Sequence, residues 1–287
     1  MRIIITGTKG YLATSLADYF IKRNNSTVLL LDVKNNSWGD TSFKEFDLII
    51  HCAALVHKNE KLYSLAEYEK INTKLTVDLA KKAKSDGVKH FIFISTMAVY
   101  GSRISCFLKN EITDKTDCVP KTKYGISKYK AENEIVKLKD ERFIVSIVRP
   151  PFVYGKNCPG NYVTLKKLVL KLGIVPKIKN LKSMIYIGNL CELMLRISEL
   201  EYSSIYMPQN NPMLSTAELS QLIAEYNGRK VLFSAVFKPF VYIASLFLPP
   251  VRKAFGNEFY SMQLSKEIPF DYNLFDCEAS IKITEGK

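Results

Sequence analysis

The sequence has few of the residues that bind metals, and it lacks a long apolar run. Its histidines (His51, His57 and His90) and its six cysteines form no Cys-x-x-Cys pair and no other recognisable zinc spacing. The longest apolar run, Phe240 to Leu248, is too short to cross a bilayer. We therefore expect no metal site and no transmembrane helix, and we expect the cysteines to be reduced thiols of a cytoplasmic protein.

Positive charge is in excess but is not concentrated in one place. The 287-residue chain has a formal net charge of +13, most of it from lysines spread along the sequence. A solvated, lysine-rich surface accounts for this, and the alternatives are steering of an anionic substrate or contact with an acidic membrane surface. Without a basic block or a nucleic-acid-binding motif, we expect no nucleic-acid partner, while peripheral membrane association stays open. Because a strand begins at Arg2, we also expect no secretory signal before it.

The first residues of the chain read as a strand, a glycine turn and a helix. Arg2–Thr6 is a short apolar strand, and it leads directly into the pattern Gly7-x-x-Gly10-x-x-Ala13 and a helix over about Tyr11 to Asn24. Glycines let the backbone approach a pyrophosphate, and the start of a helix presents amide groups and a positive dipole end. An ordinary strand-to-helix turn is the alternative, but the position after a buried strand favours a dinucleotide-binding loop.

An acidic residue follows the second predicted strand. Thr27–Leu31 reads as a strand, and Asp32 comes directly after it. A carboxylate at this place accepts hydrogen bonds from the adenosine ribose hydroxyls and repels a 2′-phosphate, which favours NAD. Lys34 lies close enough in sequence to offset that repulsion, so NADP stays open, and a simple turn residue is the other alternative.

A tyrosine and a lysine stand four residues apart in the run Tyr124-Gly125-Ile126-Ser127-Lys128. Residues with this spacing share one face of a helix. A tyrosine has a pKa of about 10, and moving it toward neutrality takes roughly 4 kcal/mol of differential stabilisation, which a nearby cation and a bound cofactor can supply. The pair is therefore suited to acid–base chemistry in the interconversion of a carbonyl and an alcohol.

Strands and helices alternate through the first half of the chain. Further strands are expected over 46–53, 90–95 and 143–148, and a helix that carries Asn72 is expected over 65–85. This alternation predicts a parallel, doubly wound sheet. The connection from Asp32 to Phe46 is short for a full crossover, so we expect that edge of the sheet to be trimmed. The polar loop from Gly101 to Lys121 is expected to cover the active site.

Several motifs together resemble a known family. In chain order they are Gly7-x-x-Gly10-x-x-Ala13, Asp32, His51-Cys52-Ala53-Ala54, Ser95-Thr96-Met97-Ala98-Val99-Tyr100-Gly101, Tyr124-x-x-x-Lys128 and Arg149-Pro150-Pro151-Phe152-Val153-Tyr154-Gly155. Over roughly residues 1 to 200, this set resembles an extended short-chain dehydrogenase/reductase of the NAD-dependent epimerase/dehydratase family. The resemblance implies an α/β fold with a Rossmann-type doubly wound parallel sheet over 1–155 and a smaller C-terminal substrate lobe over 156–287. It also implies that one strand near 183–187 returns to the Rossmann sheet, and that a nucleotide-diphosphate sugar binds between the two parts.

The resemblance also assigns roles to single residues. Thr96 would hydrogen-bond the reacting oxygen, Tyr124 would be the acid/base, and Lys128 would bind the nicotinamide ribose and lower the tyrosine pKa. Lys182 stands where many relatives have an arginine that binds the diphosphate, and Asn161 is either a substrate contact or a helix cap. The expected contacts of NAD or NADP are Gly7, Gly10, Tyr11, Leu12, Asp32, Ala53, Ala54, Asn72, Tyr124, Lys128 and Pro151.

The residues after the threonine limit the reaction. Nucleotide-sugar 4,6-dehydratases carry an Asp-Glu pair there, whereas this chain has Met97 and Ala98, which cannot transfer protons. Two oxidoreductions remain: a 4-epimerase that retains NAD, acting on a UDP-hexose or UDP-N-acetylhexosamine, and a 4-keto reductase that uses exchangeable NAD(P)H. Both use the same three catalytic residues. A non-catalytic dinucleotide-binding protein is a further alternative, although such proteins usually lose part of the catalytic set.

A closer resemblance favours the reductase. The stretches that carry it are Thr41–Lys44, Ala53–His57, Ser95–Gly101, Arg149–Tyr162 and Phe255–Tyr260. They are similar to capsular-polysaccharide reductases, which convert UDP-2-acetamido-2,6-dideoxy-4-hexulose into UDP-N-acetylfucosamine or UDP-N-acetylquinovosamine. The resemblance implies an NAD(P)H-dependent oxidoreductase of surface-polysaccharide biosynthesis that acts on a UDP-sugar.

The C-terminal third is less informative. A helix is expected over Thr216–Asn227, and the apolar stretch Val231–Leu248 is core of the substrate lobe, a dimer face or a patch that rests on a membrane. Related enzymes dimerise through two Rossmann helices, which in this chain would lie near Leu65–Ser85 and Tyr124–Lys139. We therefore expect a homodimer.

Overall fold

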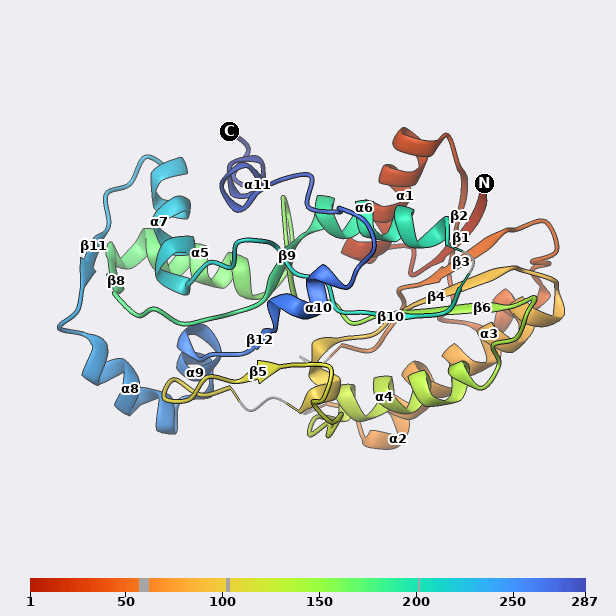
Figure 1. Ribbon diagram of the computed structural model, residues 1–287, viewed down its shortest axis with the longest axis horizontal. Coiled ribbons are helices and arrows are strands. Elements are labelled where there is room, and N and C mark those ends of the chain that lie inside the picture. The colour runs from red at the N-terminus through yellow and green to blue at the C-terminus, as the bar shows by residue number, and fades with distance from the viewer. Residues whose placement is uncertain (57–61, 102–103, 201) are drawn as a thin grey trace. The chain divides into compact units, whose positions relative to one another are not determined.

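The computed structural model describes residues 1–56, 62–101, 104–200 and 202–287 (Figure 1). His57, the last residue of the stretch Ala53–His57 that carries part of the family resemblance, lies outside these residues. The chain forms two compact units. The first unit comprises Met1–Gly101, Asp117–Pro150 and Cys191–Met207, and the second comprises Ser102–Thr116, Pro151–Leu190 and Pro208–Lys287. The chain passes between the units several times, whereas we predicted one boundary after residue 155 and one strand that returns near 183–187.

A six-stranded parallel sheet forms the centre of the first unit, in the order β10-β6-β4-β3-β1-β2. The strands are β1 (Arg2–Thr6), β2 (Thr27–Leu31), β3 (Leu48–His51), β4 (His90–Ile94), β6 (Ile144–Val148) and β10 (Ile205–Tyr206). The central strands β1, β3 and β4 are continuous apolar runs with fully buried residues, as expected for a sheet covered on both faces. This confirms the predicted Rossmann-type fold.

Helices cover both faces of this sheet (Figure 1). On one face lie α1 (Tyr11–Asn24) and the C-terminal part of α6 (Ile187–Ser198), which are joined by a 2.6 Å hydrogen bond from Tyr19 to Glu192. On the other face lie α3 (Leu75–Ser85) and α4 (Lys123–Val136). The helix expected over 65–85 is interrupted: α2 (Leu65–Tyr68) is followed by a π-helical segment, Glu69–Lys74, before α3 begins.

The prediction that the sheet is trimmed at the connection from Asp32 to Phe46 is confirmed. β2 is the outermost strand next to β1, and the connection from β2 to β3 contains only a 3-10 helix, Asn36–Asp40, among its regular elements. A single short turn replaces the usual crossover helix. The sheet order reverses between β1 and β3, because the chain leaves β1 toward β2 on one side and returns to β3 on the other. Ligands of doubly wound sheets bind at such a switch point, beyond the carboxyl ends of the strands.

The second unit is built from paired short strands and helices. Its strand pairs are β5 (Glu111–Ile112) with β12 (Phe259–Tyr260), β7 (Phe152–Tyr154) with β9 (Met184–Tyr186), and β8 (Ile174–Pro176) with β11 (Leu232–Ser234). The expectation that a strand near 183–187 joins the Rossmann sheet is wrong, because β9 pairs with β7, and β10 is the last strand of the large sheet. β5 also gives part of the predicted loop over 101–121 a regular structure.

The helices of the second unit are α5 (Asn161–Leu172), α7 (Thr216–Tyr226), α8 (Lys238–Phe247), α9 (Pro249–Phe255), α10 (Met262–Lys266) and α11 (Cys277–Thr284). The helix predicted over Thr216–Asn227 is therefore confirmed as α7, which begins with a capping box formed by Ser215 and Glu218. None of the helices in the described ranges has both the length and the hydropathy needed to cross a bilayer.

Candidate active site

Thr96 and Tyr124 come together in the first unit. Thr96 follows β4 and begins the 3-10 turn Met97–Tyr100, where its Oγ1 accepts a 3.2 Å hydrogen bond from the Ala98 amide. Tyr124 lies in the first turn of α4, whose N-cap is Thr122. The side chains of Thr96 and Tyr124 are hydrogen-bonded to each other. Two residues that the sequence placed in one catalytic set thus meet at the carboxyl end of β4.

A glycine makes this meeting possible. A Cβ atom on Gly125 would lie 2.7 Å from the carbonyl oxygen of Ala98, closer than such atoms approach one another in folded proteins. The backbone of α4 therefore packs directly on the turn that begins with Thr96. Because no other residue allows this approach, Gly125 sets the distance between the tyrosine and the threonine.

Burial dominates the acid–base properties of Tyr124. It raises the tyrosine pKa to about 12, although the hydrogen bond with Thr96 lowers that pKa. The Lys128 ammonium lies 4.1 Å from the centroid of the Phe93 ring, and its charge lowers the pKa values of His51 and Cys52, while its expected lowering of the Tyr124 pKa stays a prediction. Tyr124 therefore carries its proton at neutral pH, which is the form that can donate to a carbonyl oxygen.

The ammonium group of Lys128 is buried and loses its proton more readily than that of an exposed lysine. Burial lowers its pKa to about 7, while the neighbouring Cys52 and Glu132 raise it. The side chain is one turn after Tyr124 on α4 and is 1% exposed. A lysine in this state responds strongly to any negative charge that forms beside it.

The glycine turn after β1 has the geometry of a pyrophosphate cradle. Gly7 has a φ of +97°, and a Cβ atom there would lie 3.5 Å from the backbone of Ala53 in the loop after β3. Gly10 is the N-cap of α1, so no N-cap side chain accepts a hydrogen bond from the first amides of the helix, which include those of Tyr11 and Leu12. These residues fit the dinucleotide that the sequence predicts.

A polar cluster that the sequence analysis missed fixes the loop after β3. The Thr6 Oγ1 accepts hydrogen bonds of 3.1 Å from the amides of Cys52 and Ala53 and lies 2.7 Å from the His51 Nδ1. The His51 Nε2 is 3.0 Å from the Thr76 hydroxyl. Burial lowers the His51 pKa to about 3, so the imidazole is neutral. The cluster holds Ala53, a predicted cofactor contact, against the glycine turn, and the contact of Ala54 with the cofactor stays a prediction.

Asn72 has a structural role that is visible in its contacts. Its Oδ1 accepts from the Leu55 amide at 2.7 Å, and its Nδ2 donates to the Leu55 carbonyl and to the Ser127 hydroxyl, both at 3.0 Å. The side chain thereby ties the loop after β3 to α4. It lies in the π-helical segment, and such segments often occur at functional sites. A direct cofactor contact of Asn72 stays a prediction.

Asp32 is exposed after the edge strand β2, and its Oδ1 accepts a 2.9 Å hydrogen bond from the Lys34 amide. The carboxylate thus closes a local turn at the carboxyl end of the sheet, next to the glycine turn after β1. This position agrees with ribose binding as well as with the simple turn. The preference for NAD therefore stays a prediction.

The other expected residues belong to the second unit. Pro151 is buried before β7. Asn161 is the exposed first residue of α5, whose N-cap is Gly160, so the helix-cap alternative for Asn161 does not hold. The half-buried Lys182 donates a 2.5 Å hydrogen bond to the Lys253 carbonyl, and burial lowers its pKa. Their contacts with cofactor or substrate stay predictions. Among the described residues, no group of three or more His, Cys, Asp and Glu side chains could hold a metal ion.

Comparison with known proteins places this site in a family. Residues 3–200 match the model of the NAD dependent epimerase/dehydratase family. The chain is 31% identical over 248 residues to a UDP-glucose 4-epimerase of Vibrio cholerae, with 77% of this chain and 74% of that protein covered. It is 27% identical over 242 residues to the N-acetyl-alpha-D-glucosaminyl-diphospho-ditrans,octacis-undecaprenol 4-epimerase of Escherichia coli O157:H7, with 78% and 70% covered.

Solved structures share the fold. A UDP-glucose 4-epimerase of Thermotoga maritima superposes with a TM-score of 0.74 at 18% identity, with 100% of this chain and 98% of that chain covered. A dTDP-4-dehydrorhamnose reductase of Clostridium acetobutylicum superposes with a TM-score of 0.71 at 21% identity, with 98% and 97% covered. The family match spans the glycine turn, Thr96, Tyr124 and Lys128, and it confirms the prediction of a nicotinamide dinucleotide cofactor. The chain belongs to the NAD-dependent epimerase/dehydratase family.

Proposed function

We propose that the protein reduces the C4 ketone of a UDP-2-acetamido-2,6-dideoxy-4-hexulose with NADH or NADPH, forming UDP-N-acetylfucosamine or UDP-N-acetylquinovosamine. The observation that carries this proposal is the hydrogen bond between Thr96 and a protonated Tyr124, with Lys128 one helical turn away. A ketone oxygen beside these two hydroxyl groups receives a proton donor and a second hydrogen-bonding group.

In the proposed reduction, C4 of the sugar receives a hydride and O4 receives a proton. A bound reduced nicotinamide supplies the hydride to C4. The electron pair of the carbonyl π bond moves to O4, and the Tyr124 proton neutralises the oxygen as the alcohol forms. Thr96 hydrogen-bonds O4 and orients it toward the tyrosine. The tyrosine is left as a phenolate, whose negative charge favours the ammonium form of Lys128.

The residues after Thr96 support reduction over dehydration. Met97 is buried, and neither it nor Ala98 has a group that can transfer a proton. Elimination of water from a hexose needs its own acid and base, and this turn supplies neither.

We further propose that Lys182 binds the substrate diphosphate as a point charge and that Asn161 contacts the sugar nucleotide. The homodimer through the helical stretches Leu65–Ser85 and Tyr124–Lys139 also stays a proposal.

A 4-epimerase is the second candidate. Two relatives with 31% and 27% identity carry a 4-epimerase name, and a 4-epimerase would use Thr96 and Tyr124 in the same way. It would remove hydride from C4 and return it to the opposite face of the sugar. A non-catalytic role is less well supported, because the threonine, tyrosine and lysine are all present in one site.

The absorbance of reduced nicotinamide separates these functions. The protein is mixed with freshly generated UDP-2-acetamido-2,6-dideoxy-4-hexulose, with NADH and NADPH in parallel. Stoichiometric loss of either reduced cofactor is expected, and the faster one identifies the cofactor. Interconversion of UDP-N-acetylglucosamine and UDP-N-acetylgalactosamine without consumption of reduced nicotinamide would contradict the reductase and establish the epimerase. No turnover of any of these sugars would overturn both.

A further inference from the structure

The helix α8 presents large apolar side chains to solvent. Phe240, Ile243 and Phe247 share one face of the helix and are 66%, 59% and 76% exposed. Val236, Leu246 and Leu248 extend this apolar surface at the helix ends and are exposed as well. We call the surface formed by these six residues the α8 face. Apolar patches of this kind mark sites of contact with a protein, a ligand or a membrane.

The opposite side of α8 is anchored in the second unit. Val241 and Tyr242 pack against a buried cluster that includes Ile178 and Phe255, and the Tyr242 ring lies 5.3 Å from the Phe107 ring. The helix is therefore apolar on its packed side and on its exposed side. Helices that are apolar all round are usually buried in a protein core or a membrane, so the exposed side of α8 calls for a partner that covers it.

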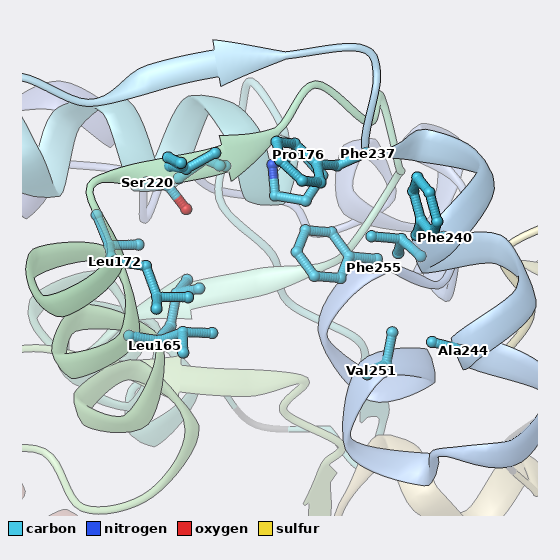
Figure 2. A pocket seen from close by; sticks show the side chains of 14 residues that line it. Leu165, Leu172, Pro176, Ser220, Phe237, Phe240, Ala244, Val251 and Phe255 are labelled. Carbon is cyan, nitrogen blue, oxygen red and sulfur yellow. The ribbon is translucent and has the colours of Figure 1, made fainter.

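An apolar cavity opens beside the α8 face. Its volume is about 420 Å³, and it lies between α5 and β8 on one side and α8 and α9 on the other (Figure 2). Phe237 and Phe240 line one wall, and Leu168 and Leu172 line the other; all four are also exposed to solvent. The one polar side chain in the lining is Ser220, whose hydroxyl donates to the Thr216 carbonyl at 2.6 Å. The cavity thus suits a hydrocarbon chain.

The segment of the chain that carries α8 and α9 has charges of one sign. Between Glu225 and Glu258 the chain has five basic residues and no acidic one. The basic residues are Arg229, Lys230, Lys238, Arg252 and Lys253. Arg252 and Lys253 are exposed in the last turn of α9, directly after the α8 face. A surface that combines exposed aromatic residues with basic residues is complementary to the interface of an anionic bilayer.

We propose that the α8 face binds the surface of an anionic phospholipid bilayer. Phe240, Ile243 and Phe247 insert at the level of the headgroups, Arg252 and Lys253 contact lipid phosphates, and a hydrocarbon chain from the bilayer enters the cavity. A second copy of the chain fits this face less well, because a two-fold interface would bring the basic residues of both copies together without an acidic partner. The proposal does not depend on which sugar the enzyme reduces.

Vesicle flotation tests the proposal directly. Vesicles of equal parts phosphatidylglycerol and phosphatidylcholine are compared with vesicles of phosphatidylcholine alone. The double variant F240S/F247S is expected to bind the anionic vesicles roughly a hundredfold more weakly, about tenfold for each lost phenylalanine. The double variant R252E/K253E is expected to lose about tenfold or more on anionic vesicles and to bind phosphatidylcholine as the parent does.

Matched controls lie in the first unit. Ile21 and Leu62 are exposed apolar residues there, and Lys81 and Lys89 are exposed basic residues, so I21S/L62S and K81E/K89E remove the same groups elsewhere. Both controls are expected to bind vesicles as the parent does, and circular dichroism checks that every variant is folded. Failure of the parent to bind anionic vesicles, or equal losses in the controls, would overturn the proposal. A parent dimer that F240S/F247S dissociates, with no vesicle binding, would assign the face to a second copy instead.

Discussion

Arg149 and Glu132 form a buried, two-pronged ion pair between the end of β6 and the middle of α4. The Arg149 Nη2 and Nε lie 2.6 Å and 3.1 Å from the Glu132 carboxylate oxygens. The Arg149 Nη1 donates to the Tyr100 hydroxyl at 2.7 Å. Because Tyr100 ends the turn that begins with Thr96, and Glu132 lies two turns after Tyr124, this pair joins the segments that carry the two proposed catalytic hydroxyl groups.

Removing the charge of Glu132 is expected to destabilise the protein strongly. The Glu132 and Arg149 side chains are 2% and 8% exposed, so E132Q leaves a buried guanidinium without its counter-charge. The expected loss is about 3–5 kcal/mol in the free energy of unfolding, measured by urea denaturation. The control E134Q removes an exposed carboxylate from the same helix and should change stability by less than about 0.5 kcal/mol. Equal effects of the two substitutions would argue against the role given to the pair.

Adding a methyl group at Gly125 is expected to separate Tyr124 from Thr96. In G125A the new Cβ would clash with the Ala98 carbonyl, so α4 must move away from Thr96. A displacement of this kind is expected to lower kcat about a hundredfold, which steady-state kinetics would measure. Gly39 is a matched control, because a Cβ there meets nothing within 4 Å. A G125A enzyme as active as G39A would show that the close approach does not matter.

The Thr96 hydroxyl is expected to raise kcat through its hydrogen bonds. T96V removes the partner of Tyr124 and should lower kcat by about a hundredfold, whereas T96S keeps the hydroxyl and should retain most of the activity. The ratio of kcat for T96S to kcat for T96V is the decisive quantity. A ratio near one would mean that the hydroxyl does not act on the reacting oxygen.

Two buried histidines are expected to make the protein sensitive to acid. Burial lowers the pKa of His51 to about 3 and that of His90 to about 4. Below pH 6.5, the usual histidine pKa, the unfolded chain binds protons that the folded chain does not, so the free energy of unfolding falls as the pH falls toward these values. Each histidine contributes a slope of about 1.4 kcal/mol per pH unit in this window.

Urea denaturation at several pH values between 6.5 and 4 measures that slope. The variant H90Q removes one of the two groups and should reduce the slope by about 1.4 kcal/mol per pH unit. An unchanged slope in H90Q would show that His90 is protonated in the folded protein as easily as in the unfolded one.

Asp32 is expected to set the cofactor preference. Its carboxylate would repel the 2′-phosphate of NADP, so D32S should raise kcat/KM for NADPH relative to NADH by about tenfold. Both cofactors are measured with the same sugar substrate. An unchanged ratio would indicate that Asp32 serves only the turn with Lys34 that the structure shows.

The strongest local patterns in the sequence predict their structures well. β1, α1 and β2 have the bounds that the sequence predicts, because an apolar strand, a glycine turn and a helical periodicity follow one another without interruption. The helix that carries both Tyr124 and Lys128 was also predictable from their spacing. The spacing even continues to Glu132, four residues after Lys128, and this could have indicated the ion pair.

Other features depend on contacts between distant residues and were not predictable. Met184–Tyr186 is a short buried run, and nothing in such a run tells whether it joins the large sheet or pairs with β7. The π-helical segment around Asn72 depends on the bonds of that side chain to Leu55 and Ser127, far away in sequence. The direction of the Lys128 ammonium depends on Phe93, on another element.

The most direct test of the proposed reduction is the position of deuterium in the product. UDP-2-acetamido-2,6-dideoxy-4-hexulose is reduced with NADH or NADPH that carries two deuterium atoms at C4 of the nicotinamide, and the product is examined by NMR. We predict deuterium at C4 of the sugar. We also predict that Y124F forms this labelled product at least about a hundredfold more slowly than the parent. A product without deuterium at C4, or a Y124F enzyme as fast as the parent, would contradict it.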